Sequence, residues 1–156
     1  MRWWKPSLAT ILLAVPLAAC GEGASETPSV QPAAFGNPAC PTAGNPGPAR
    51  GAVPDGFVTA WVLRCSVRIL NVHDGAETPS VAERADTPAE ELVAALRRPS
   101  DPRWHGFCST ELVTSPYFML VDANGRAVAP AIPADGCGKP HHDVLTALDM
   151  LPFRKL

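Results

Sequence analysis

Five cysteines are spread along this 156-residue chain, and the position of the first decides how the other four are interpreted. Cys20 closes a mostly apolar run, Leu8–Leu17, after two intervening alanines, and Arg2 and Lys5 give the chain a positive start. A positive start, a short apolar region and small residues before a cleavage point are typical of a secretory signal peptide. The run of about ten residues is too short for a membrane-spanning helix, which needs about 20. We therefore expect residues 1–19 to be a signal peptide.

The residues just before Cys20 make this signal more specific. Leu17-Ala18-Ala19-Cys20 resembles the lipobox of bacterial lipoproteins. The resemblance implies that the Cys20 sulfur receives a diacylglycerol and that cleavage leaves Cys20 as the lipidated amino terminus. Two acyl chains give stable anchoring, because each buried methylene contributes about 0.8 kcal/mol. We expect a lipoprotein held by fatty acyl chains at the extracytoplasmic face of the cell membrane. A chance cysteine beside a conventional cleavage site is the alternative.

Once Cys20 is assigned to lipid, an even number of cysteines remains: Cys40, Cys65, Cys108 and Cys137. Exported proteins fold in an oxidising compartment, so these residues are expected to form two disulfides. A structural zinc site is the alternative, but such sites use closely spaced ligand pairs, and no two of these cysteines are that close. Four cysteines allow three connectivities, which sequence does not distinguish. Our preferred pairing is Cys65–Cys108 with Cys40–Cys137.

Residues 20–50 are expected to form a lipidated N-terminus and a tether. The stretch is rich in proline, glycine and other small residues, with only Val30 and Phe35 as sizeable apolar side chains. Such a segment cannot bury enough apolar surface to offset the entropy of ordering itself. Residues 51–156 then form one globular domain.

The charge pattern and the motifs indicate which partners and cofactors this chain is expected to have. The formal net charge is −2, with both signs mixed along the chain. Nucleic-acid-binding proteins usually present a basic stripe, so we expect no nucleic-acid partner. The membrane, reached through the lipid, and an envelope protein or polymer are the partners that fit. Gly138-Lys139 lacks the earlier glycine and the following Ser or Thr of a phosphate-binding loop, and no cofactor is expected.

Two pairs of strands are expected. Phe57–Leu70 alternates in a way that predicts a strand with one buried face, which includes Cys65. A turn over Asn71–Gly75 and a weaker strand around Ser80–Ala85 follow. Tyr117–Asp122 is an apolar run of strand length, and Asn-Gly immediately after it predicts a hairpin with the residues that follow.

Each strand pair is followed by a predicted helix. Thr87-Pro88-Ala89-Glu90 has the pattern of a capping box, with Thr87 as the N-cap and Pro99 as the stop. The second helix is expected from about Pro140 to Leu151, with a shared apolar face. The order ββαββα predicts a disulfide-stabilised α+β fold, in which a small antiparallel sheet carries two helices on one face.

Histidines near the C-terminus suggest a candidate site. Asp135-Gly-Cys-Gly-Lys-Pro-His-His-Asp143 gathers residues that bind metals or act as nucleophiles. On a helix, however, neighbouring His141 and His142 point about 100° apart, which makes joint chelation of one ion difficult. We expect His141 to be partly buried and His142 to be exposed. We assign no metal site, and the two histidines are only weak candidates for one.

The remaining candidates are weaker in pattern. His73 precedes Asp74 in the expected turn, and His73 or His141 would be the base if the protein were an envelope hydrolase. No G-x-S-x-G or C-x-x-C motif accompanies them, so no catalytic residue is assigned. Trp104 and His105 lie in an aromatic loop that could contact a ligand or partner, or else pack over a disulfide at Cys108.

The folded part is similar to small secreted lipoproteins of actinobacteria that have no assigned activity. The Cys65 strand, the helix end LVAALRRPSDPR (Leu92–Arg103) and VDANGRAVAPAIPADGCGKP (Val121–Pro140) carry this resemblance. It implies architecture and location only. The expected function is a binding or structural module of the cell envelope. A hydrolase and a surface metal-binding protein using His141 and His142 are the alternatives.

Overall fold

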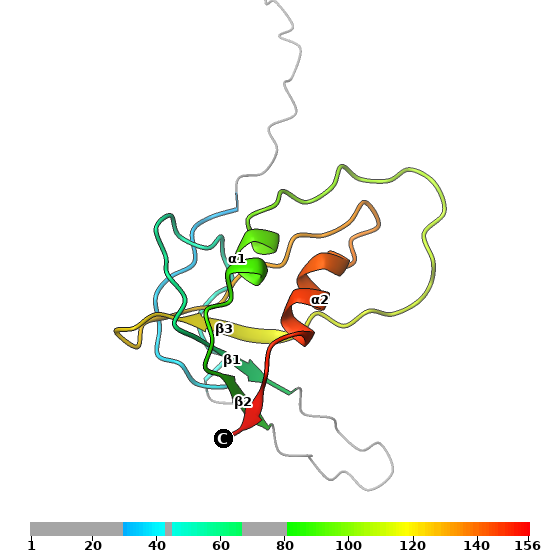
Figure 1. Ribbon diagram of the computed structural model, residues 1–156. Helices are drawn as coiled ribbons and strands as arrows, with labels where there is room; N and C mark the ends of the chain where they lie inside the picture. The colour runs from blue at the N-terminus through cyan, green and yellow to red at the C-terminus, as the bar shows by residue number, and fades with distance from the viewer. Residues whose placement is uncertain (1–29, 43–44, 67–80) are drawn as a thin grey trace, which may run out of the picture.

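The computed structural model describes residues 30–42, 45–66 and 81–156. Within them the chain forms an α+β fold with one antiparallel sheet and two helices (Figure 1), as the sequence predicted. The elements are β1 (Trp61–Cys65), β2 (Ala82–Ala85), α1 (Glu90–Leu96), β3 (Tyr117–Val121), β4 (Ala127–Val128), α2 (His142–Asp149) and β5 (Arg154–Lys155). The short β5 follows the expected ββαββα order and adds an edge strand.

The sheet is ordered β4-β3-β1-β2-β5, with β1 at its centre. Leu63 in β1 lies opposite Met119 on one side and Arg84 on the other, and both pairings are antiparallel. The strand predicted over Phe57–Leu70 is realised as the five residues of β1. Residues 67–70 and the turn expected at Asn71–Gly75 lie outside the described residues.

Both faces of the central strand are buried, whereas the sequence predicted only one buried face. Val62 is fully buried in a cluster with residues from both helices, among them Leu92 and Val144. Its neighbour Leu63 is 2 % exposed and lies in a second cluster with Met119. Successive residues of a strand point to opposite faces, so each face of β1 needs its own cover.

The two helices lie side by side and cover one face, as expected (Figure 1). The predicted capping box is wrong: α1 begins at Glu90 after Ala89, and no side chain caps it. The Thr87 hydroxyl lies 3.5 Å from the Pro88 carbonyl oxygen instead. Glu90 and Glu91 in the first turn still complement the helix dipole.

Residues before β1 contribute to both clusters, although much of that segment was expected to be a free tether: Cys40 packs against the second, whereas Ala33, Val53 and Phe57 lie in the cluster with the helices. Gly36 pairs with Ala127 of β4, and the Arg50 guanidinium lies 5.3 Å from the ring centre of Tyr117 in β3. A Cβ on Gly51 would come within 2.5 Å of the Ala33 nitrogen, so only glycine permits this close approach. Backbone pairing therefore holds the segment before β1 against the sheet, although this segment has little apolar surface of its own.

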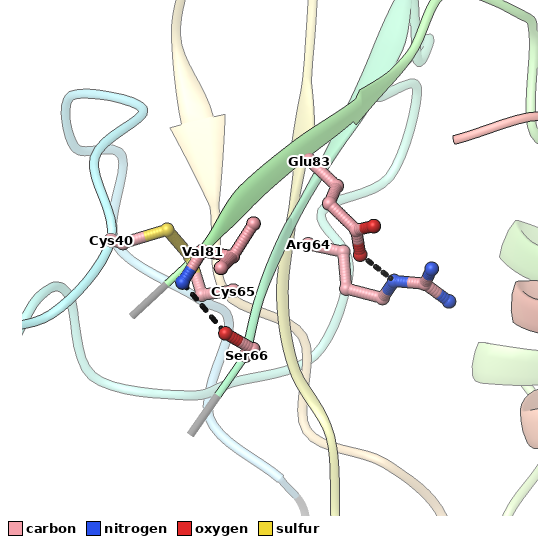
Figure 2. The surroundings of a disulfide bond; sticks show 6 residues. All are labelled: Cys40, Arg64, Cys65, Ser66, Val81 and Glu83. Carbon is pink, nitrogen blue, oxygen red and sulfur yellow. Dashed lines mark hydrogen bonds and ion pairs between the residues drawn. A yellow bond between two sulfur atoms is a disulfide. The ribbon is translucent and has the colours of Figure 1, made fainter. Parts of the chain in front are cut away.

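A disulfide fixes this segment to the sheet. Figure 2 shows Cys65 pointing toward Cys40, while the preceding Arg64 points to the opposite face, where its guanidinium lies 3.5 Å from Asp149 of α2. Beyond Cys65, Ser66 Oγ accepts a 2.7 Å hydrogen bond from the Val81 N–H and continues the link between β1 and the chain entering β2.

Two disulfides are present, as predicted, but our preferred connectivity is wrong. The bonds are Cys40–Cys65 and Cys108–Cys137, with Cα–Cα distances of 5.6 and 5.7 Å. Cys65 lies on the sheet face away from the helices, where the N-terminal segment runs. Cys108 and Cys137 lie in the loops that follow α1 and precede α2, so they meet each other instead.

The predicted β3–β4 hairpin is confirmed, and Asp122 organises its turn. Asp122 Oδ1 accepts hydrogen bonds from the N–H groups of Asn124 and Arg126, each at 2.9 Å, and Oδ2 accepts one from Arg126 Nε at 2.7 Å. Gly125 has φ of 78°, which suits glycine. Burial raises the pKa of the Asp122 carboxyl, but hydrogen bonds from Arg126 and Asn124 outweigh burial and hold the pKa below its ordinary value.

We predict that Asp122→Asn lowers the free energy of unfolding at neutral pH and matters much less in acid. The folded-state pKa is depressed, so the carboxylate stabilises the fold above the unfolded value of about 3.9, and this stabilisation disappears as the pH falls through the folded-state value. Urea unfolding at about pH 7 and about pH 2 measures the difference. Asp55→Asn, in an exposed turn, is the control. A stability gap that stays constant with pH would contradict the assignment.

We also predict that replacing Cys40 and Cys65 together by alanine lowers the free energy of unfolding by about 3–4 kcal/mol, from the chain entropy of the closed loop. The matched control replaces Cys108 and Cys137, because the two sequence separations are similar, at 25 and 29 residues. Cys65 is 5 % exposed, so its pair should show the larger loss. Urea unfolding checks this, and an equal or smaller loss would contradict the role assigned to Cys40–Cys65.

Candidate functional site

Two loops beside the helices hold most of the residues that the sequence singled out. Residues 97–116 connect α1 to β3, and residues 129–141 connect β4 to α2; we call them the loop pair. The Asp101 N–H donates to the Ala134 carbonyl at 2.8 Å, and the Trp104 N–H donates to the Gly136 carbonyl at 2.7 Å. The Cys108–Cys137 disulfide joins the loops further along. In Figure 1 they form the green-to-yellow arc and the orange segment.

Asp135 shapes the second loop around a tight turn. Its Oδ1 accepts hydrogen bonds from the N–H groups of Cys137 and Lys139 at 2.9 and 2.8 Å, and its carbonyl accepts one from Gly138. Gly138 has φ of 78°. The Asp-Gly-Cys-Gly-Lys stretch is therefore a turn that presents Cys137 to Cys108.

An open cleft of about 400 Å³ lies where the loop pair meets the start of α2. Charged and polar side chains dominate its lining: Arg98, Asp101, Glu111, Asp135, Lys139, His141, His142 and Asp143. Several already pair with one another. Arg98 forms an ion pair with Asp143, and Lys139 Nζ donates to Ser109 Oγ at 2.6 Å.

The two neighbouring histidines lie in different surroundings. His141 is 7 % exposed at the N-cap position of α2, and its Nε2 lies 3.5 Å from Asp101 Oδ2 with no hydrogen-bond partner among the described residues. His142 is exposed, and its Nε2 lies 3.4 Å from the Thr146 hydroxyl on the same helix. In the described part of the chain, no group of three or more His, Cys, Asp or Glu residues is placed to hold a metal ion.

The Ser109–Lys139 contact resembles a nucleophile with its base, a pairing that sequence reasoning missed. Ser109 is exposed, and Lys139 is only partly covered. The nearby N–H groups of Cys137, Gly138 and Lys139 all donate to Asp135. They are thus not free to stabilise an oxyanion, and acyl-transfer enzymes usually owe more of their rate to such stabilisation than to any other single effect. The contact fits a link between the two loops better than a catalytic pair. His73 lies outside the described residues.

The loop after α1 exposes large apolar side chains. Trp104 is 62 % exposed, Leu112 is 87 % exposed, and Phe107 is fully exposed. His105 beside them is exposed as well. The Trp104 ring lies against the glycine backbone at Gly106, but it does not become buried over the disulfide. Sequence reasoning pointed to the aromatic loop Trp104–Phe107, naming Trp104 and His105 as possible contacts, and it missed Leu112.

The chain was compared with protein-family models, with curated proteins and with solved structures, and none of them matches it. No helix in the described ranges has the length and apolar character that crossing a bilayer requires.

We predict that His141→Ala and His142→Ala differ sharply, although the residues are adjacent. The first removes a buried ring and should lower the free energy of unfolding by about 1–3 kcal/mol, whereas the second, at the surface, should change it by less than about 0.5 kcal/mol. Urea unfolding near neutral pH measures both. Equal losses would show that the burial of His141 contributes nothing particular to stability.

Proposed function

We propose that this protein is a lipid-anchored binding module on the extracytoplasmic face of the cell membrane. The observation that supports it most is the use of the cysteines. The chain has five, and four are consumed in Cys40–Cys65 and Cys108–Cys137. Cys20 is the one that remains, and it is the one that the lipobox-like sequence assigns to a diacylglycerol.

The disulfides also support the location. Disulfides persist in oxidising compartments and are rare in the cytosol. Two of them in a domain of this size, one inside the core and one between surface loops, fit an exported protein. The lipid supplies the membrane attachment, and the disulfides supply stability that a small core lacks.

The character of the loop pair favours binding over catalysis. Its apolar side chains are exposed, whereas Arg98 pairs with Asp143 of α2, Lys139 donates to Ser109, and the backbone donors around Asp135 hold a turn. An envelope hydrolase is the second candidate, since His141 lies 3.5 Å from a carboxylate at the edge of a cleft. For that role the imidazole nitrogen would need access to substrate, but His141 Nε2 is buried.

Replacing Cys20 tests the anchor. Mass spectrometry of the protein purified from its own membranes should find a lipidated amino terminus at Cys20, and Cys20→Ala should carry no lipid because the acceptor sulfur is gone. Replacing Cys108 and Cys137 together is the control, since that protein keeps the acceptor and should remain lipidated. An unmodified amino terminus beyond residue 20 in the parent protein would overturn the proposal.

A further inference from the structure

Trp104 and Phe107 line one hollow beside the Cys108–Cys137 disulfide and are held in place before they meet any partner, and Leu112 is exposed further along the same loop. Trp104, Phe107 and Leu112 all lie on the loop after α1. Two backbone hydrogen bonds and the Cys108–Cys137 disulfide hold that loop against its neighbour. Contact through a braced loop costs less conformational entropy than contact through a free one.

Three backbone hydrogen bonds connect this loop, through neighbouring segments, to the start of the described chain. The Ala33 N–H donates to the Ala52 carbonyl at 2.9 Å, and the Ala131 N–H donates to the Gly51 carbonyl at 2.7 Å. Three residues further along, Ala134 accepts the hydrogen bond from Asp101 in the loop. In Figure 1 the start of the described chain and the loop after α1 lie toward the same end of the molecule.

The chain between Cys20 and Val30 limits how far the domain can move from an anchor. Nine residues separate the two, and even fully extended they span at most about 35 Å. A lipid on Cys20 would therefore keep the loop pair close to the bilayer and make its contact with lipid effectively intramolecular.

We propose that the loop after α1 docks on the bilayer that holds the lipid, with Trp104 and Phe107 entering the interface between headgroups and acyl chains and Leu112, further along the loop, adding apolar contact. This inference rests on the lipid anchor proposed above. Tryptophan concentrates at that interface because its ring is amphipathic. The protein then has two membrane contacts, a covalent lipid and an aromatic loop, which together fix the orientation of the domain.

The charges of the loop pair indicate whether docking requires anionic lipid headgroups. It carries four cationic and three anionic side chains: Arg97, Arg98, Arg103, Lys139, Asp101, Glu111 and Asp135. Arg98 is paired with Asp143 of α2, which leaves three charges of each sign. This balance gives no net attraction to anionic headgroups. Docking is therefore driven by apolar contact, and it should occur on neutral phosphatidylcholine and change little with added salt.

Tryptophan fluorescence can test this on the native lipoprotein. Trp3 and Trp4 fall within the expected signal peptide, so the mature chain has only Trp61 and Trp104, and Trp61→Phe leaves Trp104 as the reporter. The protein is reconstituted in phosphatidylcholine vesicles with or without lipids brominated on their acyl chains. We expect a blue-shifted Trp104 emission, quenching by brominated lipid and protection from aqueous iodide. Replacing Phe107 and Leu112 together by serine should lower the docked-to-free ratio on the order of tenfold, since both are exposed in the free domain.

The outcomes separate the anchor from the docking. Failure to float with vesicles overturns the lipid anchor itself. A protein that floats while iodide quenches Trp104 as fully as in lipid-free Cys20→Ala keeps the anchor and overturns the docking. Protection from iodide without quenching by brominated lipid means that protein, such as a second copy, covers the loop, and it overturns the docking as well. Salt-dependent docking that requires anionic lipid would overturn the apolar mechanism.

Discussion

The whole arrangement depends on burying β1 on both faces. Val62 and Leu63 are neighbours on the central strand, so they point in opposite directions, and each is almost fully removed from solvent. Two helices cover one side. On the other side, the segment before β1 contributes only Cys40 to the buried cluster, and backbone pairing at Gly36 with the disulfide from Cys40 supplies its attachment. The core is thus completed by covalent and hydrogen bonds where apolar surface is scarce.

The second disulfide has a different role. Cys108–Cys137 contributes little to the core, since both residues are exposed, but it joins the two loops that flank the helices. Together with the Asp135 turn, it gives a fixed shape to stretches without helix or strand. A binding surface on loops usually needs such bracing, because free loops lose conformational entropy on contact. The domain therefore carries one disulfide for its interior and one for its surface.

Sequence reasoning succeeded where a local pattern determined the structure. Asn124-Gly125 predicted its hairpin, and the spacing of Val144 and Leu148 predicted the buried face of α2. It failed where distant segments decide the outcome. The connectivity of Cys65 depends on which segment lies over its face of the sheet, and no local signal in a proline-rich stretch reveals that it docks there. The exposure of Phe107 depends likewise on how two loops meet. The capping box failed for a local reason, since the helix starts later along the chain than the pattern implied.

The Cys40–Cys65 bond also determines how the domain bears mechanical load. A force applied to the chain ahead of Val30 first meets the hydrogen bonds at Ala33 and Gly36, which can detach one at a time. Detachment stops at Cys40, where the tension passes through sulfur directly into the central strand. Pulling can therefore release only the short stretch from Val30 to Cys40 as slack before the force must shear the sheet itself. If this bond were reduced, the same force could detach the segment before β1 step by step, because no covalent link would stop it at Cys40.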